Sequence, residues 1–252
     1  NKFSLPFSLV LSTNQTNFTT PKAPNQDFFQ YLQNPMNRIT ISPKYAWAQA
    51  HLGHYIPKYS DLSTGNIPVF GAGIDLTPGK FQFSAFAGNS QRHIEPDSAS
   101  NIPGAYERRF YAVRVGYGKE GKPTFGLNFV TVNDDTNSVS RRVLNKLPES
   151  GALTTFSFEV PITDMLEFYG EAGACYFVRN KFADDLGGDV PDILPDYLIP
   201  KQSSRVDGAA KGAVKFKQEN WGVELTTLLI GDGYVPLGYR FMQSDRLEFT
   251  LA

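Results

Sequence analysis

The sequence predicts an all-β fold, an antiparallel up-and-down transmembrane β-barrel of about twelve strands, and three observations lead to this prediction. Large apolar residues alternate with small or polar residues along most of the chain. Tight turns alternate with long links between the expected strands. Charged side chains of both signs share one face of the strands, and aromatic and aliphatic side chains share the other. We expect residues 1–252 to form a single domain.

The composition restricts the classes of function. The charges nearly cancel, with 24 Lys and Arg against 25 Asp and Glu, which excludes a strongly basic nucleic-acid binder and an acidic disordered tail. The sequence has no run of about 18 apolar residues, so we expect no transmembrane helix, although a barrel crosses a membrane with alternating residues. A single cysteine, Cys175, excludes an internal disulfide and gives no metal cluster.

The period-two pattern is clearest in the first expected strand, residues 2–12, where every odd position from Phe3 to Leu11 is large and apolar. Pro6 has no backbone N–H to donate, so this strand should lie at an edge or at the closing seam of the sheet. The same alternation predicts further strands near residues 37–43, 46–54, 68–76, 80–91, 106–117, 123–133, 152–161, 165–178, 203–217, 220–230 and 245–251.

The connections between these strands carry a second signal. Because alternate connections of an up-and-down sheet lie at the same end, all the long links should lie at one end and all the tight turns at the other. Short periplasmic turns and long extracellular loops are typical of outer-membrane barrels. The pattern therefore predicts a bacterial outer-membrane protein with a periplasmic amino terminus. Tight turns are expected at residues 43–45, 77–79, 118–122, 162–164 and 218–219, and long links at 13–36, 55–67, 92–105, 134–151, 179–202 and 231–244.

The charged face of the strands is the candidate lining of a lumen, because charges of both signs suit a water-filled or ion-paired interior. Tyrosine and tryptophan near strand ends, such as Tyr117 and Trp221, suit the two interfacial girdles of a membrane protein. A soluble β-sandwich with a charged outer face remains the alternative. The candidate lumen-lining residues are Arg114, Glu159, Glu167, Glu171, Asp207, Lys211, Lys215 and Glu224.

Several turn and loop segments carry a resemblance to a known family. The segments are Asn37–Trp47 (NRITISPKYAW), Gly71–Phe81 (GAGIDLTPGKF), Pro103–Arg108 (PGAYER), Asn133–Ser138 (NDDTNS) and Gly231–Tyr239 (GDGYVPLGY) with Asp245-Arg246. The sequence resembles, over nearly its whole length, a poorly characterised, porin-like family of outer-membrane β-barrel proteins of Bacteroidota. That resemblance implies the location and the fold, and it implies no reaction and no functional residue. Members of the family continue past the last of these segments, so the chain is either a whole barrel or the amino-terminal portion of a longer one.

The sequence offers only weak candidates for a catalytic site. His51 and His54 are three residues apart, so on one strand they face opposite sides and cannot hold one metal ion. There is no Gly-x-Ser-x-Gly motif, and the geometry of a Ser-His-acid set cannot be read from sequence. Glu167 and Glu171 are about 13 Å apart along a strand, too far for a glycosidase pair. We expect no enzyme and no cofactor.

One loop is a weak candidate for Ca²⁺, because carboxylates on a flexible glycine-containing loop can ligate that ion. Its candidate ligands are Asp184, Asp185 and Asp189, whose spacing does not match an EF-hand. A solvated acidic loop is the alternative interpretation.

Two functions follow from the predicted fold. The first is porin-like passage of small solutes through a charged lumen, with the aromatic-rich link Thr13–Met36 as a candidate constriction. The second is a structural or accessory barrel subunit of an outer-membrane assembly or secretion complex. A soluble carbohydrate-binding protein and an outer-membrane hydrolase are further alternatives. The expected partners are outer-membrane lipid and other outer-membrane or periplasmic proteins, and no nucleic acid.

Overall fold

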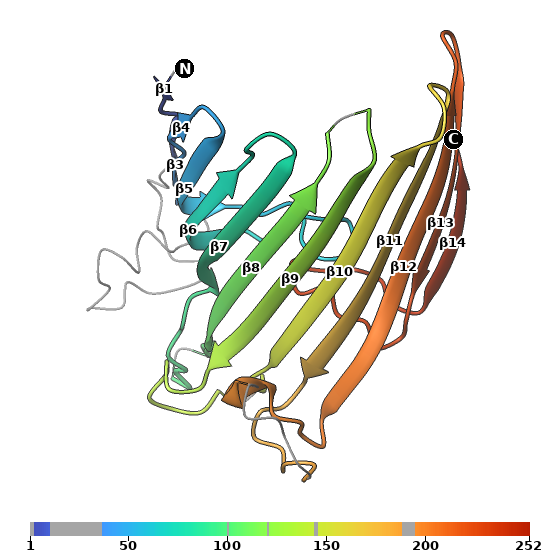
Figure 1. Cartoon of the computed structure of the whole chain (residues 1–252). Helices are drawn as coiled ribbons and strands as arrows, with labels where there is room; N and C mark the ends of the chain where they lie inside the picture. The colour runs from blue at the N-terminus through green and yellow to red at the C-terminus, as the bar shows by residue number, and fades with distance from the viewer. Residues whose placement is uncertain (1–2, 11–36, 100, 120, 144–145, 188–194) are drawn as a thin grey trace.

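A computed structural model describes residues 3–10, 37–99, 101–119, 121–143, 146–187 and 195–252. They form one curled antiparallel sheet in which neighbouring strands follow one another along the chain (Figure 1). A short 3₁₀ helix, η1 (Asp196–Leu198), lies in a long link, and no described helix is long and apolar enough to cross a bilayer. The strands are β1 (Phe3–Ser4), β2 (Phe7–Val10), β3 (Arg38–Ile41), β4 (Lys44–Tyr45), β5 (Ala48–Tyr55), β6 (Val69–Leu76), β7 (Phe81–Gln91), β8 (Glu107–Tyr117), β9 (Thr124–Asp135), β10 (Ser150–Pro161), β11 (Leu166–Val178), β12 (Ser204–Lys217), β13 (Gly222–Ile230) and β14 (Arg246–Leu251).

The predicted all-β, up-and-down architecture is confirmed. Strand β1 continues into β2, and β3 into β4, because the register is the same on both sides of each break, as in Phe3↔Tyr45 and Phe7↔Ile41. The 14 segments therefore amount to twelve passes of the chain. Pro6 and Pro43 interrupt the two strands, and the β1/β2 strand lies at the edge of the sheet, as Pro6 predicts. The other edge is β14, and in the described residues the two edges do not pair.

The connections alternate in length as predicted. The tight turns gather at the upper end of Figure 1, and the links after β7, β9 and β11 lie at the lower end. The first tight turn differs from the prediction in its position. It was expected at residues 43–45. Lys44 and Tyr45 instead pair with Gln49 and Ala48, and the turn lies at Ala46, whose φ is 50°. The predicted constriction at Thr13–Met36 lies outside the described residues.

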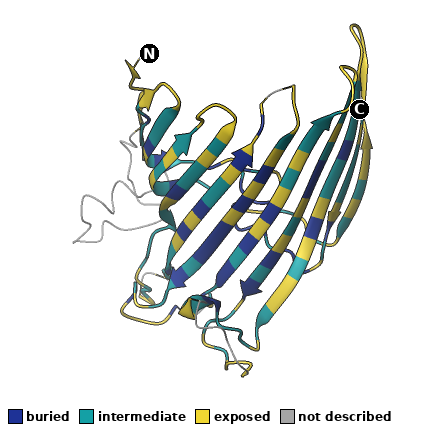
Figure 2. Ribbon diagram, viewed as in Figure 1, coloured by how far each residue is buried: buried dark blue, intermediate teal, exposed yellow. Residues whose placement is uncertain are grey.

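The two faces of the sheet differ as the alternation predicts. Exposed and buried residues alternate along the strands (Figure 2). The outer face carries large apolar side chains that no second sheet covers in the described residues, with Phe81 63%, Phe125 44%, Phe156 48% and Trp221 55% exposed. A soluble sandwich would bury these side chains between its sheets. The interpretation as a β-sandwich is therefore wrong.

The core lies on the inner face of the sheet. Two links, residues 56–68 and 231–245, cross this face instead of projecting from the end of the sheet (Figure 1). We call these two segments the plug. Inward side chains of β7 to β13, among them Phe110 and Val130, pack with plug residues in one apolar cluster. The plug residues in the cluster are Tyr59, Leu62, Tyr234 and Leu237.

Candidate functional site: the inner face of the sheet

Four consecutive plug residues, 59–62, are tied to four different strands of the sheet. Each contact joins a polar group of the plug to an inward side chain of the wall, so the plug has a defined position on the inner face. These contacts are from Arg114 Nη1 to the Tyr59 carbonyl oxygen (2.5 Å), between the Thr155 and Ser60 hydroxyls (3.0 Å), from Lys211 Nζ to Asp61 Oδ2 (2.5 Å), and from the Leu62 N–H to Glu171 Oε1 (3.2 Å).

The two halves of the plug also bind one another. The carbonyl oxygen of Gly238 accepts the backbone N–H groups of residues 65–67, and the Tyr234 hydroxyl donates to the Leu62 carbonyl oxygen at 2.8 Å. A Cβ atom at Gly238 would lie 2.5 Å from the Thr64 Cα, so only glycine allows this approach. Burial raises the pKa of Tyr239 to about 12, so this phenol stays neutral at pH 7.

Five of the predicted lumen-lining residues surround one polar cavity of about 290 Å³, and Tyr59, Asp61 and Tyr169 are also on its wall. A second cavity of about 270 Å³ adjoins it, since Arg114 and Tyr59 line both. The second cavity also has Asp75, Gln82 and Ser84 on its wall. The five residues are Arg114, Glu159, Lys211, Lys215 and Glu224.

The other three predicted lumen-lining residues make local contacts on the same face. Glu167 pairs with Lys215 at 3.3 Å. Glu171 is 3% exposed and accepts the Tyr169 hydroxyl at 2.6 Å as well as the plug amide of Leu62. Asp207 accepts the backbone N–H of Gly233 at 2.6 Å, which ties the second half of the plug to β12.

Ser42, His51 and Asp75 form a chain of hydrogen bonds that sequence reasoning left open. Asp75 Oδ2 lies 2.7 Å from His51 Nε2, and the Ser42 hydroxyl lies 3.2 Å from His51 Nδ1. In serine hydrolases the hydroxyl instead meets Nε2 and the carboxylate meets Nδ1. Ser42 is 8% exposed and His51 4% exposed. We interpret the set as a polar clasp that joins neighbouring strands.

The other histidines form no common site with His51. His54 packs against the Phe70 ring with centroids 4.9 Å apart, so it does not share the His51 site, as the odd spacing predicts. His93 Nδ1 lies 3.8 Å from Glu107 Oε2. Cys175 is buried, and its sulfur accepts the Val235 N–H at 3.3 Å, so it is a small packed residue of the core.

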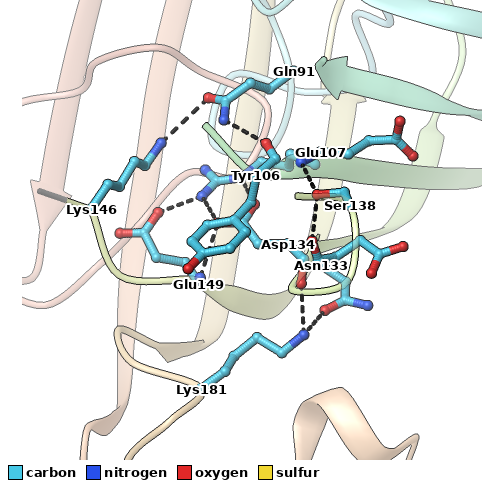
Figure 3. A network of polar contacts seen from close by, with 11 residues as sticks. Gln91, Tyr106, Glu107, Asn133, Asp134, Ser138, Lys146, Glu149 and Lys181 are labelled. Atoms are coloured by element: carbon cyan, nitrogen blue, oxygen red, sulfur yellow. Dashed lines mark hydrogen bonds and ion pairs between the residues drawn. The ribbon is translucent and has the colours of Figure 1, made fainter. Parts of the chain in front are cut away.

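Charged residues also form a network of contacts at the end of the sheet where the long links lie (Figure 3). Arg108 forms two hydrogen bonds with the fully buried Asp134, at 2.6 and 2.8 Å, and a third with Glu149 at 2.5 Å. Lys181 Nζ donates to Asn133 Oδ1 at 2.6 Å and to the Asp134 carbonyl oxygen at 2.7 Å. Burial lowers the pKa of Lys181. The links after β9 and after β11 are therefore fixed to β8 and β9.

The calcium prediction stays a prediction. Asp185 pairs with Lys201, and the Asp184 carbonyl oxygen accepts the Gln202 N–H at 3.0 Å. Asp189 lies outside the described residues. Within the described ranges no group of three His, Cys, Asp or Glu side chains is placed to hold a metal ion.

The plug is the part of the site that sequence reasoning missed. The sequence does contain a sign of the plug. In the half of each strand nearest the long links, the inward-facing side chains are apolar instead of charged. Val130, Val132 and Leu153 point inward there and are at most 2% exposed. Side chains of this kind need an apolar cover, and in a wide barrel the cover has to be a segment that folds inside.

Comparison with known proteins finds a similar fold among solved structures. No protein-family model and no curated protein matches the chain. Among solved structures, the fold is similar to that of a loop L8 deletion mutant of OmpT, an outer membrane protein of Vibrio cholerae. The two chains are 10% identical, the match covers 90% of this chain and 69% of that one, and the TM-score is 0.46. A likeness of this degree supports no conclusion about function.

Proposed function

We propose that this chain is an integral outer-membrane β-barrel protein that lets small polar solutes pass along its charged inner face. The observation that supports the proposal is the pairing of an uncovered apolar outer face with an inner face that holds ionised side chains around polar cavities. The apolar outer face can contact the hydrocarbon core of a bilayer, whereas the charged inner face has to point away from it. The long links then lie outside the cell and the tight turns in the periplasm.

The plug limits the size of the solutes that can pass along the inner face. Its apolar cluster fills the inner face nearest the long links, and the polar cavities lie beside it, so we propose passage of small solutes at low conductance rather than an open pore. We also propose that the protein is not an enzyme, because the Ser42–His51–Asp75 set is buried and its imidazole is turned the opposite way from that of a hydrolase.

Planar bilayers test this function. The purified protein should give small, discrete ionic currents, and Lys215→Glu, which reverses a charge on the cavity wall, should change their cation-to-anion preference. Lys119→Glu, at an exposed tight turn, serves as the matched control and should leave that preference unchanged. Reproducible silence of correctly folded protein would exclude passage.

The second candidate function is an accessory barrel subunit of an outer-membrane assembly or secretion complex. One observation favours it: the plug covers part of the inner face. This function requires a stoichiometric protein partner. Purification in mild detergent should then recover one, and a chain that stays alone at all protein concentrations would count against this candidate.

A further inference from the structure

One cavity on the inner face carries an excess of positive charge. The cavity of about 270 Å³ has three cationic side chains and one carboxylate, Asp75, among the described residues of its lining. Asp75 Oδ2 lies 2.7 Å from His51 Nε2, and its negative charge also attracts Arg114. The carboxylate and one cation are therefore already engaged with neighbours. The remaining two cations are Lys44 and Lys58.

These two lysines come from separate elements, Lys44 from β4 and Lys58 from the plug. Both side chains are exposed, and neither ammonium makes a hydrogen bond or an ion pair in the part of the chain that the structure describes. Charges of one sign around a concave site with low-dielectric walls focus the electric field and raise the local concentration of counter-ions. The cavity is therefore suited to an anion.

Neutral polar groups beside the lysines can bind hydroxyl groups of the same ligand. Gln49 is the cross-strand partner of Lys44, so their Cβ atoms are about 5 Å apart. Gln82 lines the cavity from β7, and its amide oxygen would lie 3.3 Å from a Cβ atom at Gly116, so this side chain extends toward β8. Neither carboxamide hydrogen-bonds to another described residue, and each has two N–H donors and an acceptor oxygen.

An aromatic ring completes the lining. Trp47 lies in the hairpin between β4 and β5, lines the cavity and is 52% exposed. An exposed indole offers a flat apolar surface against which the C–H groups of a sugar ring can pack. The volume is near the lower end of the roughly 300–1,000 Å³ range of small-molecule pockets, which favours a single ring over a longer chain. Ammonium groups, carboxamides and an indole around one small cavity match a sugar ring that carries an acidic group.

We propose that this cavity binds acidic monosaccharides of the uronic acid class. Lys44 and Lys58 bind the carboxylate through charge-assisted hydrogen bonds. Gln49 and Gln82 bind the ring hydroxyls, and Trp47 packs against the ring. The site rests on the proposed function, since it names the class of solute that enters the barrel.

Equilibrium dialysis of the whole folded protein in detergent micelles tests the site with radiolabelled glucuronate. Two unlabelled competitors separate the contributions, because glucuronamide keeps the hydroxyls without the charge and acetate keeps the charge without the ring. We expect the protein to retain glucuronate, and each competitor to displace it only at about tenfold higher concentration than unlabelled glucuronate does. Equal competition by glucuronamide would identify a site for neutral sugars, and equal competition by acetate a site for simple anions. Either result, or no retention of glucuronate, overturns the proposal.

Variants test the two lysines. Lys44→Gln and Lys58→Gln should each weaken glucuronate binding about tenfold, because each removes one charge-assisted hydrogen bond. Lys119→Gln removes the same charge at an exposed tight turn and should leave the affinity unchanged. Both lysines of the site are exposed and make no contact of this kind in the described chain, so the two variants should keep the fold. Unchanged affinity in either folded variant would contradict the proposal.

The site and the proposed passage can fail separately. Ionic currents in planar bilayers without retention of glucuronate would overturn this site and leave the passage standing. Retention of glucuronate without currents would support the site and exclude the passage.

Discussion

Glu171 is the residue on which the position of the plug depends most. Its buried carboxylate accepts the Leu62 N–H and the Tyr169 hydroxyl, and Glu171→Ala leaves both donors without a partner. We expect this change to lower the free energy of unfolding by about 1–3 kcal/mol. Urea unfolding in phospholipid vesicles measures it, with Glu219→Ala at an exposed tight turn as the control. Equal stability of the two variants would show that the contact does not hold the plug.

Ser42 tests the interpretation of the polar clasp. Because the hydroxyl is buried and meets Nδ1 of His51, we expect an alkyl fluorophosphonate to leave the folded protein unlabelled. Mass spectrometry of the reacted protein, with Ser42→Ala as the background, detects any adduct. An adduct on Ser42 would identify a nucleophilic serine and contradict the proposal that the protein is not an enzyme.

Neighbouring residues of one strand should respond in opposite ways to the same substitution. Phe156 of β10 points outward and is 48% exposed, whereas Ser157 points inward and lines the cavity. Phe156→Arg places a charge in hydrocarbon and should cost about 2–4 kcal/mol if the residue lies near the bilayer midplane. Ser157→Arg should cost much less in the same vesicle unfolding assay. A larger cost at Ser157 would reverse the assignment of the two faces.

The strands could be predicted from sequence because one local rule describes them. In β8 and β9, residues such as Tyr111, Val115 and Phe125 alternate with Arg114 and Asn128, and this alternation follows from the pleat of a strand. Pro6 marked the edge strand for a similar local reason, since it has no N–H to donate.

The plug and the partners of the charges could not be predicted in this way. Residues 56–68 and 231–245 have no period, and their position depends on contacts between residues far apart in sequence, such as Tyr234 with Leu62. The same holds for Arg114, because an alternating pattern shows which face it lies on but not which groups surround it. Similarly, the Ser42–His51–Asp75 clasp requires three strands to be placed before it can be recognised.

The orientation of the whole molecule can be tested at its two ends. If the long links lie outside the cell, Ala99→Cys should react with a membrane-impermeant maleimide on intact cells that carry the protein in their outer membrane. Lys119→Cys, at a tight turn, should react only after that membrane is permeabilised. Both positions are exposed, and the native Cys175 is buried and provides a low background. The reverse pattern of labelling would place the tight turns outside.

The alternation of environment along a single strand is the most direct test of the fold in its membrane. Nitroxide spin labels placed one at a time at residues 125–129 of β9, in a Cys175→Ala background, report collision with oxygen, which is concentrated in lipid, and with a water-soluble nickel chelate. Labels at Phe125, Leu127 and Phe129 should show high oxygen accessibility and low nickel accessibility in vesicles, because these side chains point outward. Labels at Gly126 and Asn128 should show low oxygen accessibility, because both residues are buried on the inner face. Oxygen accessibility that does not alternate, or that is highest at residues 126 and 128, would contradict an apolar face turned to lipid and a charged face turned inward.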